Sequence, residues 1–253
     1  MFNPLDYPFL ILALSLPSFW FAAWVGASLR ARRRAMQEES HEDFSFVLGA
    51  TLTLLGLIIG FTFSMAVSRY EQRKNYEEDE ASAIGTEYIR ADLLPASDAA
   101  QVRALLRSYL DQRILYYGSR SERQRRAINA QTAQVQTQLW SAVTTPALTQ
   151  QTCVMALAVS GMNDVLNSQG YTQAAWWNRI PTGAWVLLVS ISLFCNLLIG
   201  YAMHMKGRFL FLILPIALSV SLFLIADIDS PRHGIISVRP QNLESLAESL
   251  RSP

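Results

Sequence analysis

Residues 46–74 constrain the fold of this chain more than any other stretch. Residues 46–67 carry no charged side chain. As a helix, this run is ~33 Å long, about the thickness of the hydrocarbon core of a bilayer. It continues directly into a densely charged segment, with no glycine or proline between Gly60 and Gly85. The pattern predicts one helix that leaves a membrane and continues for several turns into water.

Three further runs of the same kind indicate a multi-pass membrane protein. The four charge-free runs are 8–29, 46–67, 182–203 and 209–226. Each is long enough to cross a bilayer as a helix. The sequence therefore predicts an all-α membrane protein with four transmembrane helices and a helical soluble domain between the second and third. The predicted division is 1–67, 68–181, 182–229 and a C-terminal amphipathic tail at 230–253.

The soluble segment reads as helical throughout. Ser97 and Asp98, after Pro95, are typical of a helix start. Thr145-Pro146 predicts the start of a second helix, which is expected to end near Gly170. The tail has an apolar stripe that suits either a subunit-docking arm or a frayed end. The expected apolar faces are Val102, Leu105, Leu106, Tyr109, Leu110 and Tyr117; Ile128, Val135 and Leu139; Leu148, Met155, Met162 and Leu166; and Leu243, Leu246 and Leu250.

Charge excludes some functions but does not orient the chain. A net charge of +1 gives no reason to expect a nucleic-acid partner. Four spans place both termini and residues 68–181 on one side of the membrane, and the positive-inside rule compares the basic residues near the spans. Six lie on each side, so the rule gives no orientation. They are Arg30, Arg32, Arg33, Arg34, Lys206 and Arg208 against Arg69, Arg73, Lys74, Arg179, Arg232 and Arg239.

Nothing in the sequence predicts an enzyme, a cofactor or a metal site with a full set of ligands. His41, His204 and His233 lack metal-ligand spacing with cysteines or acids. Cys153 falls in the soluble segment and Cys195 inside the third span, so no disulfide is expected.

The second span carries two faces. Gly56, Gly60 and Ser64 form a ridge of small residues that lets helices approach closely, and packing within one subunit is its ordinary meaning. Another face carries a stripe, defined here as Thr53, Leu57 and Phe61. Such a stripe usually faces lipid or a core. In an oligomer around an axis it would line a pore, and apolar rings gate pores by dewetting.

Two acidic groups have open interpretations. Asp227 and Asp229 end the fourth span, where carboxylates are costly and often functional; alternatively they cap the chain exit or pair with Arg69 or Arg232. Glu77, Glu78, Asp79 and Glu80 form a solvated face or, in an oligomer, acidic rings that concentrate cations.

Several motifs together resemble the bacterial bestrophin-like membrane proteins. The second span passes through Phe61-Thr-Phe-Ser-Met-Ala-Val-Ser-Arg-Tyr-Glu-Gln-Arg73, similar to the junction after the bestrophin neck helix. Ile89-Arg-Ala-Asp-Leu-Leu-Pro95 and the following Arg103–Leu110 helix resemble the bestrophin helix, Leu-Pro turn and next helix. Two further segments complete the likeness. One is Asn178–Trp185, before the third span, and the other is Asp227-Ile-Asp-Ser-Pro231 with the amphipathic stretch that follows it, which is similar to the bestrophin exit from the last span.

The resemblance implies a pentamer around a central pore, with cytosolic termini and a cytosolic helical domain. It puts Thr53, Leu57 and Phe61 at the pore neck. Asp227 and Asp229 fall near the acidic region that binds calcium in animal bestrophins. At the neck, Thr53 replaces a bulky apolar residue. At the end of the fourth span, two acids replace a longer cluster, and this difference argues against calcium binding here.

The sequence thus supports two hypotheses. The first is a homo-oligomeric ion channel of a bacterial inner membrane, embedded in lipid, with cations favoured and with vestibule charge from Glu77 to Glu80, Asp227 and Asp229. The second is a non-conducting membrane sensor or scaffold whose helical domain binds a protein partner.

Overall fold

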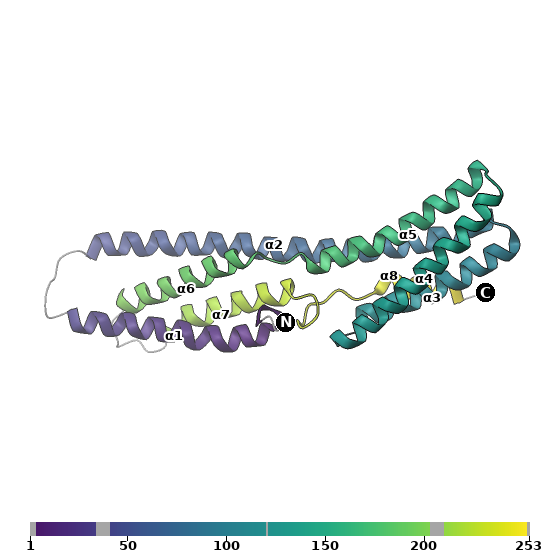
Figure 1. Ribbon diagram of the computed structural model, residues 1–253. Coiled ribbons are helices and arrows are strands. Elements are labelled where there is room, and N and C mark those ends of the chain that lie inside the picture. The colour runs from purple at the N-terminus through teal and green to yellow at the C-terminus, as the bar shows by residue number, and fades with distance from the viewer. Residues whose placement is uncertain (1–3, 34–40, 120, 203–209, 252–253) are drawn as a thin grey trace. The chain divides into compact units, whose positions relative to one another are not determined.

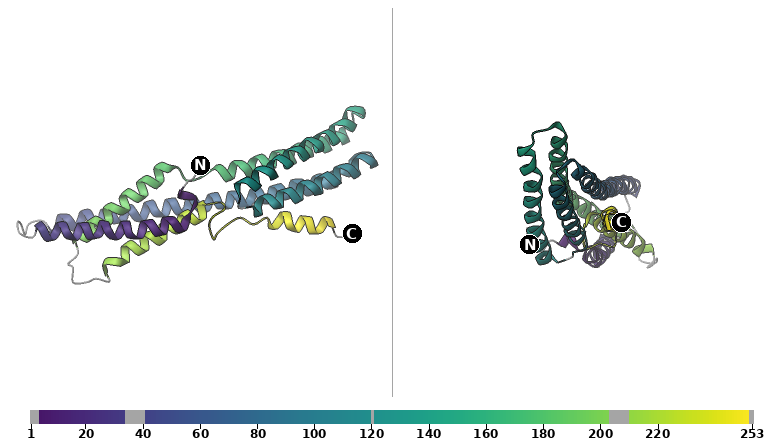
Figure 2. Two further views of the ribbon diagram at one scale, coloured as in Figure 1. Left: turned by 60° about the horizontal axis from the view of Figure 1, so that its bottom comes forward. Right: turned by 90° about the vertical axis from the view of Figure 1, so that its right-hand side faces the viewer.

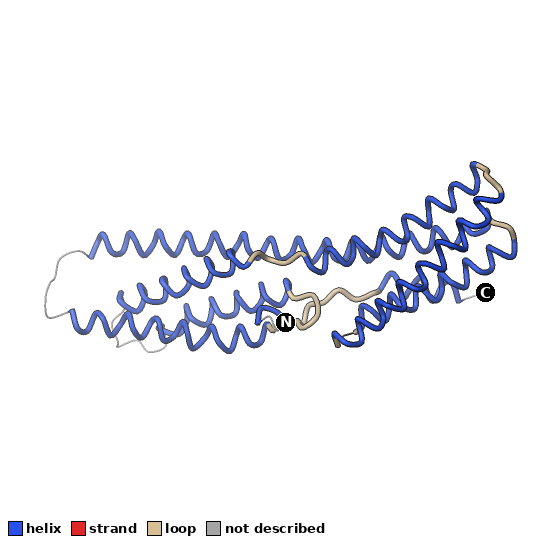
Figure 3. The backbone as a smooth tube through the Cα atoms, in the orientation of Figure 1, coloured by secondary structure: helices blue, strands red, loops and turns tan. Residues whose placement is uncertain are grey.

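The computed structural model describes residues 4–33, 41–119, 121–202 and 210–251. These residues form helices and loops without a strand (Figure 1, Figure 3). The helices are η1 (Pro4–Asp6), α1 (Pro8–Arg33), α2 (His41–Arg90), η2 (Ala91–Leu93), α3 (Ala96–Gly118), α4 (Glu122–Thr149), α5 (Cys153–Trp177), α6 (Thr182–Ala202), α7 (Leu210–Asp229) and α8 (Gln241–Arg251).

The chain divides into two compact units. The membrane unit comprises Met1–Tyr70 and Arg179–Ser237, and the helical unit comprises Glu71–Asn178 and Val238–Pro253. The C-terminal tail therefore groups with the helical unit. The division predicted at 67/68 and 181/182 concerns membrane boundaries, and it stays a prediction.

Among the described residues, four helical stretches are long and apolar enough to cross a membrane. They are Pro8–Arg30, Phe44–Leu93, Cys153–Ala202 and Phe211–Asp229. Each overlaps one predicted charge-free run, which confirms the four-span, all-helical prediction. Within the second stretch, the charge-free part is 46–67, and residues 68–90 carry too many charges to lie in hydrocarbon.

The membrane unit packs around α1. Both α6 and α7 lie along α1 (Figure 1, Figure 2). Two glycines allow the close approach of α1 and α6: a Cβ at Gly26 would lie less than 3.0 Å from the Leu197 carbonyl oxygen, and one at Gly200 equally close to that of Ala23. At the end of this crossing, the Arg30 guanidinium donates to the carbonyl oxygens of Tyr201 and Ala202.

The core of the membrane unit is apolar and draws on all four of its long helices. α2 contributes Leu55 and Ala66, which are buried with Phe19 of α1, Leu188 of α6 and Leu222 of α7. One side of the membrane-unit part of α2 is thereby fixed against the unit, and the opposite side of that part faces outward.

The helical unit contains α3, α4, α5 and α8 beside the later part of α2. Helix α3 follows Pro95, as predicted. The helix start predicted at Pro146 is wrong, because Pro146 lies inside α4, which runs on to Thr149. The next helix, α5, begins at Cys153, where the Thr152 hydroxyl accepts a hydrogen bond from Met155 N at 3.2 Å. It also continues through Gly170 to Trp177, beyond the predicted end.

The tail forms helix α8, which docks within the helical unit. Leu243 and Ala247 are buried, and Arg251 pairs with Asp111 of α3 at 2.9 Å. The tail is therefore not frayed, but it docks on its own chain. Docking of the tail on another subunit stays a prediction.

Candidate functional site

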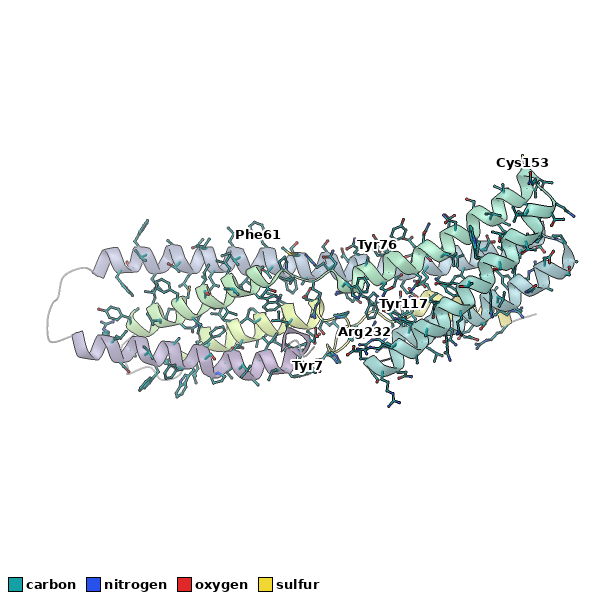
Figure 4. The ribbon with its side chains drawn as sticks, in the orientation of Figure 1. Tyr7, Phe61, Tyr76, Tyr117, Cys153 and Arg232 are labelled. Atoms are coloured by element: carbon teal, nitrogen blue, oxygen red, sulfur yellow. The ribbon has the colours of Figure 1, made fainter. Side chains whose placement is uncertain are left out.

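The predicted stripe lies on the outward face of α2. Leu57 is 54% exposed and Phe61 is 64% exposed, whereas Leu55 is 2% exposed. At 3.6 residues per turn, Leu55 and Leu57 point roughly 160° apart around the helix. Figure 4 shows Phe61 on the side of α2 away from the rest of the membrane unit. The stripe is thus not covered by the described part of its own chain, and it is available to lipid, to another subunit or to a pore.

The glycine ridge faces outward as well. A Cβ added at Gly56 or at Gly60 would meet nothing within 4 Å in the described part of the chain, and Ser64 is exposed. The sequence favoured packing of these glycines against another helix of the same subunit. The structure shows no such packing of Gly56 or Gly60 in the described part of the chain. A role in packing between subunits stays a prediction. The glycines that do pack closely within the membrane unit are Gly26 and Gly200.

Asp229 belongs to a buried ionic junction at the end of α7. Its side chain is 1% exposed and lies 3.5 Å from Nε of Arg179. It also accepts a hydrogen bond from the backbone N–H of Ile180 at 3.2 Å. The Arg179 guanidinium pairs with Asp6 too, so one arginine joins η1, the segment before α6 and the end of α7. Burial lowers the pKa of Arg179.

Asp227 closes the loop that follows α7. Its two oxygens accept the backbone N–H groups of Ile235 at 2.7 Å and Ile236 at 2.8 Å. Gly234 allows this turn, because a Cβ there would lie 2.6 Å from the Asp227 carbonyl oxygen. In the same loop, His233 stacks on Tyr7 with ring centroids 4.9 Å apart, close to the start of α1 where Figure 4 marks Tyr7.

These residues do not fit a calcium ion. Both oxygens of Asp227 are used by backbone donors, and Asp229 already faces the positive charge of Arg179. Calcium needs six to eight oxygen ligands, and no group of three or more acids, histidines or cysteines able to hold a metal occurs among the described residues. The two aspartates act as acceptors that hold chain segments together.

Two of the four acids at 77–80 are structural, which corrects their assignment as vestibule charge. Glu77 accepts hydrogen bonds from Asn242 N at 2.9 Å and Leu243 N at 3.0 Å, and so caps α8. Glu80 pairs with Arg113 in a fully buried ion pair and also accepts from the Thr172 hydroxyl at 3.2 Å. Asp227 and Asp229 are buried as well. Of the six predicted vestibule acids, Glu78 and Asp79 are the exposed ones.

A sequence model of the Bestrophin-like domain matches residues 13–243. The chain belongs to the Bestrophin-like family. This confirms the resemblance drawn from the short motifs.

Solved bestrophin structures share the fold of this Bestrophin-like chain. A point variant of a bacterial bestrophin homologue from Klebsiella pneumoniae matches with a TM-score of 0.68 and 12% identity, over 94% of this chain and 97% of that one. A second variant of that homologue matches with a TM-score of 0.65 and 13% identity, over 96% and 97%. No curated protein matches the chain.

Sequence reasoning missed the basic partners in this Bestrophin-like protein. The sequence predicts no partner for Arg179, which belongs to the basic residues near the spans and to the Asn178–Trp185 motif, and none for Arg113. Arg113 lies 33 residues from Glu80, and Arg179 lies 50 residues from Asp229. Spacing carries no signal at such separations. The one available clue was a basic residue inside an otherwise apolar helical face at Arg113.

Proposed function

We propose that the protein is a homo-oligomeric ion channel in which the outward face of α2 lines the pore neck. The observation that carries this proposal is the apolar stripe of α2, which is exposed although it belongs to a membrane helix whose opposite side is buried. A helix held to its own subunit by one side can offer the other side to an axis. Membership of the Bestrophin-like family supports the same arrangement. Five is the subunit number that the resemblance to bestrophins implies.

The glycine ridge supports close packing of subunits around that axis. Gly56 lies about 100° from Leu57 around the helix, and Gly60 lies about 60° from it. If the stripe faces the axis, the ridge faces the neighbouring subunit. Small residues at that position let adjacent copies of α2 approach closely, which narrows the neck.

Conductance of single channels in planar bilayers tests the neck. Leu57→Ala and Phe61→Ala each remove apolar bulk from the proposed ring, so a higher conductance or a larger open fraction is expected. Phe63→Ala is the matched control, because Phe63 is also an exposed phenylalanine of α2 but lies about 120° from Leu57. Equal conductance in Leu57→Ala, Phe61→Ala and wild type would remove the neck assignment.

A preference for cations rests on Glu78 and Asp79. Both are exposed acids of the helical unit, and fixed negative charge raises the local concentration of cations. The double variant Glu78→Gln, Asp79→Asn should shift the reversal potential in a salt gradient toward zero. A Glu77→Gln variant is not a suitable control, because Glu77 caps α8. An unchanged reversal potential would assign selectivity to other groups.

We further propose that the helical unit faces the cytosol and that the membrane is the bacterial inner membrane. Cys153 is an exposed native thiol of the helical unit, and Cys195 is buried. A membrane-impermeant maleimide should label Cys153 in inverted vesicles and not in intact spheroplasts. Arg32→Cys in a Cys153→Ser background should give the opposite pattern.

The alternative function is a non-conducting sensor or scaffold that binds a protein partner through the helical unit. Large apolar side chains exposed on this unit favour it, among them Leu148 at 74% and Trp177 at 73%. The test is conductance of the purified wild-type oligomer in bilayers of defined lipid composition. Absence of conductance would favour this alternative over the channel.

A further inference from the structure

Glu87 is a buried carboxyl group whose environment the channel proposal does not explain. It lies on α2 in the helical unit, and its exposure is 0%. Neither Oε1 nor Oε2 has a hydrogen-bond partner in the part of the chain that the structure describes. The residue lies 20 positions beyond the charge-free run, so lipid does not account for its burial.

A glycine of α5 makes room for this side chain. A Cβ at Gly161 would lie less than 3.0 Å from Oε2 of Glu87 and from Nη1 of Arg90. The carboxyl group therefore packs directly against the α5 backbone. Any larger residue at 161 would displace it, so this part of the contact between α2 and α5 requires a glycine.

Two charged groups act on Glu87 from the helices that enclose it. Arg90 of α2 attracts the ionised form, and Asp164 of α5 repels it. Nη1 of Arg90 lies 4.0 Å from the Asp164 carboxylate, so its charge is shared between two acids. Arg90 and Asp164 are both partly exposed, which weakens their effect on a fully buried neighbour.

An ionised carboxylate is unstable in this environment. A buried acid without hydrogen-bond donors loses its hydration, and the attraction of Arg90 compensates only part of this loss, so its charged form is disfavoured. Burial accordingly raises the pKa of Glu87 to about 8, against the opposing effect of Arg90. At neutral pH the group is a neutral carboxylic acid.

We propose that Glu87 is a proton-dependent packing residue, neutral while α2 and α5 are in contact, and that loss of its proton weakens this contact. The proposal goes beyond channel activity and holds whether or not the protein conducts. It makes the helical unit sensitive to alkaline pH near the physiological range. If the channel proposal is also correct, the same proton links pH to the unit that follows the neck.

The direction of the pH effect follows from the two states of the acid. In the unfolded chain the group has the ordinary pKa of 4.5, and in the folded protein it has a pKa of about 8. Between these values the folded protein holds a proton that the unfolded chain has lost, so stability falls as pH rises. The contribution is complete below the unfolded pKa and is lost as pH rises through the folded pKa.

Thermal unfolding of the full-length protein in detergent tests the effect on stability. Between about pH 5 and about pH 8.5, the wild-type Tm should fall as the unfolded and then the folded carboxyl ionises. Glu87→Gln keeps a neutral side chain of similar size, so its Tm should fall much less. Glu78→Gln, an exposed acid of the same helix, should follow wild type. A Glu87→Gln slope equal to the wild-type slope would overturn the proposal.

Infrared spectroscopy gives a readout that does not require a variant to fold. At about pH 6.5 ordinary carboxyl groups are ionised, so a persisting carboxylic-acid C=O band would report a group like Glu87. The band should disappear as pH passes about 8. Asp164→Asn removes a repelling charge and should move this midpoint to lower pH. A wild-type protein without any such band at about pH 6.5 would overturn the proposal.

Discussion

Oε1 of Glu77 accepts a hydrogen bond from the backbone N–H of Leu243 at 3.0 Å, so a side chain of α2 caps a helix 166 residues further along the chain. The same oxygen accepts from Asn242 N, and Oε2 accepts from the Asn242 side chain at 2.7 Å. Negative charge at the first turn also suits the helix dipole. The C-terminal helix is therefore held by an acid that, in the sequence, belongs to a charged run.

Removing this cap should loosen α8. Glu77→Ala leaves the first N–H groups of α8 without an acceptor, and a lost cap costs about 0.5–2 kcal/mol. Amide hydrogen exchange across Gln241–Arg251 should become faster. Glu78→Ala changes an exposed acid next to it and should leave this exchange unchanged. Equal protection of α8 in both variants would mean that Leu243 and Ala247 suffice to hold the helix.

Breaking the buried pair of Glu80 and Arg113 should destabilise the helical unit strongly. Arg113→Met leaves Glu80 buried without its cation, and the loss of one partner of such a pair costs about 3–5 kcal/mol. Denaturant unfolding of the detergent-solubilised protein measures this change. Arg126→Met, in the exposed pair with Glu122, is the control and should leave stability unchanged. The hydroxyl groups of Thr172 and Tyr117 also donate to Glu80, at 3.2 and 3.4 Å. A small effect of Arg113→Met would show that these two hydroxyls alone satisfy Glu80.

Substitution by alanine should have different effects at Gly200 of α6, which is closely packed, and at Gly60 of α2, which faces outward. Gly200→Ala forces a Cβ to less than 3.0 Å from the Ala23 carbonyl oxygen, so α1 and α6 must separate. We expect a clear loss of thermal stability of the single subunit. Gly60→Ala meets nothing within 4 Å in the described part of the chain, so the subunit should be unaffected and any change should appear in the oligomer. Thermal unfolding measures the loss of stability in Gly200→Ala, and size-exclusion chromatography measures the change of oligomer size in Gly60→Ala.

Calcium should not stabilise the protein. Both carboxylates at the end of α7 are engaged, by backbone N–H groups at Asp227 and by Arg179 at Asp229. A ligand that binds only the folded state raises Tm in proportion to its binding free energy. We expect equal Tm values with millimolar calcium and with a chelator. A calcium-dependent rise in Tm that disappears in Asp227→Asn would contradict this assignment.

The local sequence pattern was sufficient to predict which segments are helical, but not the residues at which the helices begin and end. The charge-free run at 46–67 and the absence of breakers before Gly85 predicted the continuous helix α2, which the structure confirms. Pro146 misled the prediction, because a proline in a late turn of a helix disturbs only one hydrogen bond and the helix can end one turn later. Gly170 was expected to end α5, but burial of Thr172, Ala175 and Trp176 carries the helix past it.

The sequence by itself determined the membrane helices and the family, since hydrophobic length and short motifs are properties of consecutive residues. It also determined which residues of α2 share a face, because helical geometry follows from spacing alone. Only the tertiary structure decided which of those faces is buried, and which acids are structural. From the sequence, Glu77 and Glu80 suit a solvated face, and Asp227 and Asp229 suit either functional acids or groups that cap the chain exit. Their partners lie between 8 and 166 residues away, and burial and pairing at such separations depend on packing that no local pattern encodes.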